Sequence, residues 1–168
     1  MIKKTVIFDL DGTLAIIEKR KKISRKPDGR INWEIFFKPS NISLDQPNEP
    51  VVKIAQLFAL DGYKIVILSG RSDRTFEATN SWLLKYNIPY DKLIMRPDKF
   101  LKKGDKIADG NIATQDMRFM PDEVLKKNML DTFLDVNDIF LVVDDRDKVV
   151  KMWRSLGLKT FQVDYGNF

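Results

Sequence analysis

Short apolar runs alternate with amphipathic segments along most of the chain. The runs rich in β-branched or other large apolar residues cover 5–8, 65–68, 92–95, 139–143 and 159–163. Segments with helical periodicity cover 48–60, 73–86, 121–134 and 147–156. Runs of this length separated by amphipathic helices are typical of βαβ units, in which the strands are parallel. The pattern therefore predicts an α/β fold with a doubly wound parallel sheet.

The helix predictions depend on apolar residues that recur every three or four positions. Pro50 and Pro121 lie in the first turns of their segments, and Gly157 follows the last one, as expected for helix starts and stops. The residues expected to face the core are Val51, Ala55, Phe58, Ala78, Trp82, Tyr86, Leu125, Met129, Phe133, Val149, Val150 and Trp153.

Two segments interrupt this alternation. Residues 15–47 contain the basic stretch "EKRKKISRKPDGR" and the aromatic stretch "NWEIFFKPS", and they are too long for an ordinary loop. We expect them to form a small cap inserted over the site. Residues 96–120 form a second long connection. For both segments, the alternative is a solvated and partly mobile excursion.

Composition limits the chemistry that is available. The chain has 168 residues, 43% of them apolar, which suits one domain, 1–168, carrying an insertion. It has no cysteine and no histidine, so disulfides, Cys/His zinc sites, thiol nucleophiles and imidazole bases are excluded. The net charge of +5 favours polyanionic ligands. No apolar stretch approaches the roughly 20 residues of a membrane span, and no signal peptide is recognisable, so we expect a cytoplasmic protein without a membrane partner.

Candidate chemistry begins at the end of the first predicted strand, in "FDLDGT" (residues 8–13), where Asp9 and Asp11 follow a buried run. A second acidic pair, Asp144 and Asp145, follows the run 139–143. The carboxyl ends of parallel strands meet at one edge of a sheet, where ligands bind. Four acids at one edge predict a bound cation, and hard oxygen ligands favour Mg²⁺. The alternative is that such acids lie in solvent at turns.

A third strand end and one helix add further polar groups. Ser69 and Arg71 follow the run 65–68 in "ILSGR". The alternative interpretation of this stretch is a glycine turn with an exposed arginine. Lys126 comes four residues after Asp122, a spacing that is also that of an ion pair on a solvated helix face.

Taken in order, "DLDGT", "LSGR", Lys126 and "VVDDRD" resemble the four motifs of the haloacid dehalogenase superfamily of phosphohydrolases. Within it, the chain is similar to the 3′-phosphatase domain of phage-type polynucleotide kinase/phosphatases. Arg20, eleven residues after Asp9, and the final stretch from 144 to 168 belong to this similarity. No GxxxxGK[ST] loop is present, so no kinase domain is expected. The "INWEIFF" insert and the 96–120 connection depart from the bifunctional enzymes.

The resemblance implies a sheet with the first strand central and the "DD" strand beside it. It implies that Asp9 is the nucleophile, that Asp11 is the general acid and base, and that Lys126 binds the transferring phosphoryl group. It also implies a Mg²⁺ site made of Asp9, the backbone carbonyl of Asp11, Asp144 and Asp145. Asp122 would orient Lys126, and Gly12 would permit the turn. The implied substrate-binding set is Thr13, Arg20, Ser69, Gly70, Arg71 and Asp122.

The expected substrate is a phosphorylated nucleic-acid end, most consistent with a 3′-phosphate, and no obligate protein partner is evident. Trp33, Phe36 and Phe37 either stack a base or form the insert's own small core. Two alternatives remain open, a free-nucleotide phosphatase and a nucleic-acid-end binding module that has lost turnover. The intact set of acids and Lys126 favours an enzyme.

Overall fold

A five-stranded parallel sheet forms the centre of the molecule, and its order is β5-β4-β1-β6-β7. The computed structural model describes residues 4–97 and 120–166. The strands are β1 (Thr5–Phe8), β4 (Lys64–Ser72), β5 (Lys92–Arg96), β6 (Ile139–Arg146) and β7 (Thr160–Gly166). The first strand is central and the strand with the paired aspartates lies beside it, so the predicted parallel sheet is confirmed.

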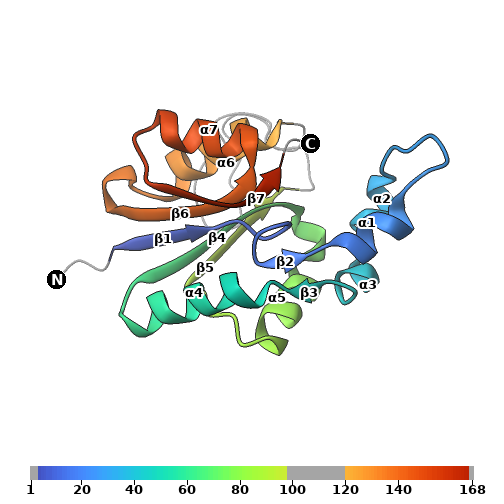
Figure 1. Cartoon of the computed structure of the whole chain (residues 1–168), viewed down its shortest axis with the longest axis horizontal. Coiled ribbons are helices and arrows are strands. Elements are labelled where there is room, and N and C mark those ends of the chain that lie inside the picture. The colour runs from blue at the N-terminus through green and yellow to red at the C-terminus, as the bar shows by residue number, and fades with distance from the viewer. Residues whose placement is uncertain (1–3, 98–119, 167–168) are drawn as a thin grey trace.

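Helices cover both faces of this sheet. They are α4 (Glu49–Leu60), α5 (Phe76–Lys85), α6 (Asp122–Phe133) and α7 (Asp147–Ser155), with short 3-10 turns at Asp73–Thr75 and Val136–Asp138. In Figure 1, α6 and α7 lie on one face, and α4 and α5 lie on the other. The chain is therefore doubly wound, as the sequence predicted.

The central strand shows why this arrangement follows from an apolar run. Val6 and Phe8 pack in a core cluster that includes Trp82 of α5, whereas Ile7 packs in a second cluster that includes Trp153 of α7. Successive side chains of a strand point to opposite faces, so a strand covered on both sides has to be apolar throughout. Packing on both faces holds β1 rigidly, so its carboxyl end has a fixed position where the sheet strands end.

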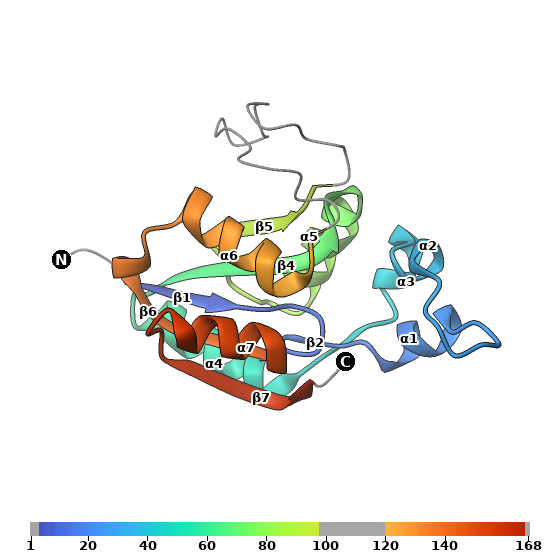
Figure 2. The same cartoon turned by 90° about the horizontal axis from the view of Figure 1, so that it is seen from above.

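Residues 15–47, called the insert below, leave and rejoin the core through a two-stranded antiparallel ribbon. The ribbon pairs β2 (Ala15–Ile16) with β3 (Gln46–Pro47). Between these strands lie three short helices: α1 (Glu18–Ser24), α2 (Trp33–Phe36) and α3 (Pro39–Ile42). Figures 1 and 2 show the insert projecting beyond the carboxyl ends of the sheet strands. It is thus attached next to the strand ends that carry the acids.

The second long connection predicted from the sequence, 96–120, lies outside the described residues apart from its ends. In the parts of the chain that the structure describes, no helix combines the length and the apolar character needed to cross a bilayer.

Candidate active site

Three buried carboxylates meet where β1 and β6 end. The backbone N–H of Asp9 donates to the carbonyl of Val143 at 2.9 Å, which sets Asp9 beside Asp144. Carboxylate oxygens of Asp9, Asp144 and Asp145 lie within 4.8 Å of one another. The structure therefore brings together three of the four acids that the sequence placed on two different strand ends.

Lys126 of α6 is the cation at this acidic cluster. Its Nζ lies 2.7 Å from Oδ1 of Asp9 and 2.8 Å from Oδ2 of Asp144. Burial raises the pKa of Asp9 well above its usual 3.8, and the charges of Asp144 and Asp145 raise it further, although Lys126 opposes them. Three carboxylates facing one ammonium group leave an excess of negative charge, which is the condition in which a site accepts a divalent cation.

Asp122 and Lys126 do not form the i,i+4 ion pair that their spacing left open as an alternative. Asp122, in the first turn of α6, accepts from Nη2 of Arg96 at 2.5 Å and also from Nη1 of Arg146. Arg96 ends β5 and Arg146 ends β6, so both reach Asp122 from the sheet edge. The i,i+4 interpretation was wrong because each partner met groups of opposite charge on other elements. The same geometry corrects the expectation that Asp122 orients Lys126.

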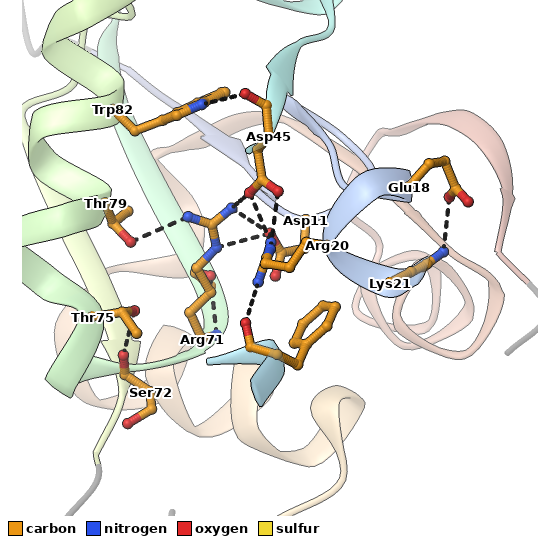
Figure 3. A network of polar contacts seen from close by, with 12 residues as sticks. Asp11, Glu18, Arg20, Lys21, Asp45, Arg71, Ser72, Thr75, Thr79 and Trp82 are labelled. Atoms are coloured by element: carbon orange, nitrogen blue, oxygen red, sulfur yellow. Dashed lines mark hydrogen bonds and ion pairs between the residues drawn. The ribbon is translucent and has the colours of Figure 1, made fainter. Parts of the chain in front are cut away.

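Asp11 is held by two arginines (Figure 3). Its Oδ1 accepts from Nε of Arg71 at 2.8 Å and from Nη2 of Arg20 at 2.5 Å. Burial by itself would raise the pKa of Asp11, but the Arg71 and Arg20 guanidinium groups lower it to about 2. Its carboxylate is thus paired with these two cations and is not one of the three clustered carboxylates.

Asp45, a residue that sequence reasoning missed, binds the same two arginines. It accepts from Nε and Nη2 of Arg20 at 3.0 and 2.9 Å, and from Nη2 of Arg71 at 2.7 Å. Nη1 of Arg71 also donates to Thr79 Oγ1 at 3.2 Å. Two carboxylates and two guanidinium groups form a balanced buried cluster that joins the insert to the core.

Other predicted residues lie behind the acids rather than at the open surface. The Thr13 hydroxyl donates to Oδ1 of Asp145 at 3.1 Å, and Ser69 Oγ accepts from the backbone N–H of Arg71 at 3.1 Å. Gly12 has a φ of +90°, and a Cβ there would lie 2.3 Å from Oδ2 of Asp145. Glycine is therefore required at position 12 by the turn and by the close approach of Asp145.

A cavity of about 800 Å³ opens above the acids. Of the site residues predicted from the sequence, six line this cavity: Asp9, Asp11, Gly70, Asp122, Lys126 and Asp145. The other predicted residues, Thr13, Arg20, Ser69, Arg71 and Asp144, do not line it. The insert contributes Ile17, Lys21, Arg25, Gly29, Ile31, Trp33, Phe36 and Phe37.

The sequence also missed Arg96 and Arg146, which line the cavity. Each lies at the carboxyl end of a predicted strand, so the signal that identified Ser69 applied to them as well. Asp45 gave no such signal, because it is a single acid in an aperiodic polar segment.

A family model described as "Polynucleotide kinase PNKP phosphatase domain" matches residues 3–168. Among solved structures, a chain of the Pnkp1/Rnl/Hen1 RNA repair complex is 31% identical, with a TM-score of 0.71. The match covers 99% of this chain but 44% of that one, so this chain spans less than half of the relative's length.

More distant structures share the fold. A predicted phosphatase from Clostridium acetobutylicum is 14% identical, with a TM-score of 0.64, over 96% of this chain and 85% of the other. A substrate-bound phosphoserine phosphatase is 18% identical, with a TM-score of 0.51, over 96% of this chain and 87% of the other.

Proposed function

Because this chain belongs to the family of polynucleotide kinase PNKP phosphatase domains, in the haloacid dehalogenase superfamily, we propose that it removes a terminal 3′-phosphate from polynucleotides. The observation that carries the proposal is the meeting of Asp9, Asp145 and Lys126 on one wall of a cavity of about 800 Å³ that also has cationic walls. That volume exceeds the needs of a phosphate group and leaves room for a nucleotide.

In the proposed reaction, a carboxylate oxygen of Asp9 attacks phosphorus while the bond from phosphorus to the ester oxygen breaks. Asp11 gives a proton to the departing alcohol. Water then attacks the aspartyl-phosphate, Asp11 takes a proton from that water, and inorganic phosphate leaves with Asp9 restored. Lys126 and Gly70, which line the cavity, bind the phosphoryl oxygens, and Lys126 is suited to this because its ammonium group already contacts Asp9. Ser69, which does not line the cavity, supports the strand end by accepting from the backbone N–H of Arg71.

The two arginines at Asp11 favour its ionised form, which is the form that accepts a proton from water. The first half of the reaction needs the protonated form. A dianionic phosphate ester bound beside Asp11 raises the pKa of its carboxyl and so favours this protonation. In this scheme Arg20 and Arg71 position Asp11, and they do not clamp the substrate directly.

The donor set fits Mg²⁺, because it consists of buried carboxylates whose charge Lys126 balances only in part. The carboxylates of Asp9 and Asp144 and the backbone carbonyl of Asp11 would hold the ion, with Asp145 in support. A bound Mg²⁺ would shield the charge of Asp9 from that of the phosphate.

We also propose that 1–168 is a single catalytic domain and that the insert acts as its cap. Residues of the insert line the same cavity as the acids, which supports this role. Its Lys21 and Arg25 face the cavity, so a strand entering there meets positive charge before it reaches Asp9.

A substrate panel tests the proposal. Phosphate release with Mg²⁺ is compared for a 3′-phosphorylated oligonucleotide, a 5′-phosphorylated oligonucleotide and a 3′-mononucleotide, with Asp9→Asn as the blank. The 3′-phosphorylated oligonucleotide should have the highest kcat/KM. If it contacts the enzyme through about three phosphates, log affinity should fall with log salt at a slope near −2, from about −0.7 per phosphate.

The same panel identifies the alternatives. Equal or better turnover of the mononucleotide at every salt concentration would replace the proposal with a nucleotidase. Absence of phosphate release from all three substrates would favour a binding module.

A further inference from the structure

The aromatic residues of the insert do not form one uniform core. Phe36 is only 5% exposed, and the guanidinium carbon of Arg20 lies 4.2 Å from the centre of its ring. Trp33, three residues earlier, is 56% exposed although it lines the cavity. The structure therefore assigns Phe36 to packing and leaves Trp33 at the surface of the site.

Trp33 and Phe37 lie nearly parallel, with ring centres 5.8 Å apart and planes inclined by 18°. Phe36 meets both rings edge-on, at 84° to Trp33 and 82° to Phe37. One buried ring thus supports two stacked rings beside the cavity, and their orientation is set by packing before any ligand arrives.

The surroundings of this pair define the chemistry of a ligand. Lys21 and Arg25 of the insert and Arg96 and Arg146 of the core line the same cavity. A flat aromatic surface beside several cations matches a ligand that is both planar and anionic.

We propose, on the basis of the phosphatase function above, that Trp33 and Phe37 form a stacking platform for the base of the nucleotide that carries the scissile phosphate. Stacking is available to every base, so the platform selects for the presence of a base and not for its identity. A base inside a duplex is already stacked on its neighbours, so the platform also favours single-stranded ends over paired ones.

The test compares two oligonucleotides with a 3′-phosphate that differ only in the terminal nucleotide, which is either intact or abasic. Wild-type enzyme should prefer the intact substrate, with a KM lower by roughly 5- to 150-fold, the range that corresponds to stacking of one base. In Trp33→Ala the ratio between the two substrates should collapse toward one, and Trp33→Phe should restore much of it. Ile35→Ala is the matched control, because Ile35 is exposed on the same helix but does not line the cavity.

A binding measurement supplies a readout that does not depend on turnover. The chain has three tryptophans, and Trp82 and Trp153 are 3% and 0% exposed, so added oligonucleotide should quench mainly Trp33. In an Asp9→Asn background, quenching should be strong with the intact end, weak with the abasic end and lost in Trp33→Phe.

The outcomes separate this inference from the proposed function. Equal KM values for the intact and abasic substrates in wild-type enzyme would overturn the platform while leaving the 3′-phosphatase in place. A Trp33→Ala enzyme that keeps the wild-type ratio would also overturn it, and this comparison applies even if the variant is less stable. Failure to hydrolyse either substrate would overturn the proposed function itself and the platform with it.

Discussion

Replacing Asp45 tests whether the buried charge cluster holds the insert and Asp11 in place. Asp45→Ala removes three hydrogen bonds, to Arg20 Nε and Nη2 at 3.0 and 2.9 Å and to Arg71 Nη2 at 2.7 Å. Both arginines are fully buried, so the variant leaves two guanidinium groups with the single carboxylate of Asp11. The substitution therefore creates an unbalanced positive charge in the interior.

The expected loss of stability follows from this imbalance. Removing one partner of a buried ion pair costs about 3–5 kcal/mol. Burial raises the pKa of Asp45, with Arg71 and Arg20 opposing it, so its charged form is only partly compensated. We therefore expect the lower end, about 3 kcal/mol, or a fall in Tm of roughly 6–12 °C for a chain of this size.

Urea and thermal unfolding measure this loss. Asp28→Ala is the control, because Asp28 also pairs with an arginine, Arg30, but on the exposed surface, where no measurable change is expected. Adding Arg20→Met to Asp45→Ala restores the balance of one arginine and one carboxylate. The double variant should therefore lose less stability than the sum of the single variants, by about 0.5–3 kcal/mol.

Activity on a small phosphate ester provides a second readout. Asp45→Ala should lower kcat more than it raises KM, because Asp11 loses its fixed position while the other residues of the cavity lining are kept. If Asp45→Ala has wild-type stability and wild-type kcat, the cluster neither holds the insert nor positions Asp11, and the reasoning from this geometry fails.

Four further predictions concern the acidic cluster and its surroundings. Asp9→Asn should lower turnover at least ~10³-fold, about 4 kcal/mol of barrier, without loss of folded structure by circular dichroism, since an amide cannot form the acyl-phosphate; wild-type turnover would exclude Asp9 as the nucleophile. Chelator should abolish turnover and Mg²⁺ restore it, and full activity in excess chelator would disprove the metal requirement. In chelator, the free energy of unfolding should also fall as pH rises from near 3.8 through the raised pKa of Asp9, because the folded state holds that proton more tightly than an unfolded carboxyl of pKa 3.8. Mg²⁺ should flatten this dependence, whereas a profile that is flat in chelator would contradict it. Gly12→Ala should lose stability and activity, whereas Gly62→Ala, with a φ of +88° and no neighbour within 4 Å, should lose only the roughly 1–3 kcal/mol of backbone strain; equal losses would show that contact with Asp145 is unimportant.

The strands, the helices and the acidic cluster were predictable because their signals are local. A strand buried on both faces reads as an apolar run, and a helix reads as a period near 3.6. Asp9 and Asp144 each follow such a run, and parallel pairing brings the ends of adjacent strands to one edge of the sheet. The position of a residue relative to its own strand was therefore enough to predict that Asp9, Asp144 and Asp145 would meet, but not that the Asp11 carboxylate would pair with two arginines instead.

Ion-pair partners were decided only by the tertiary structure. Asp122 and Lys126 have the spacing of a helical pair, yet each binds residues of other elements, because the burial of opposite charges nearby outweighs a weak surface interaction. The same holds for Asp45, whose meeting with Arg71 joins two segments that are 26 residues apart. No periodicity encodes such a contact.

The sequence by itself determined the α/β fold, the edge of the sheet that carries the chemistry, and the residue types available there. The tertiary structure alone decided that Arg20 and Arg71 hold Asp11, that Arg96 and Arg146 join the cavity wall, and that Trp33 stays exposed while Phe36 is buried. The physical reason is that hydrophobic periodicity acts through one element at a time. The direction and partner of a polar side chain depend on the packing of several elements, which is settled only when the whole chain has folded.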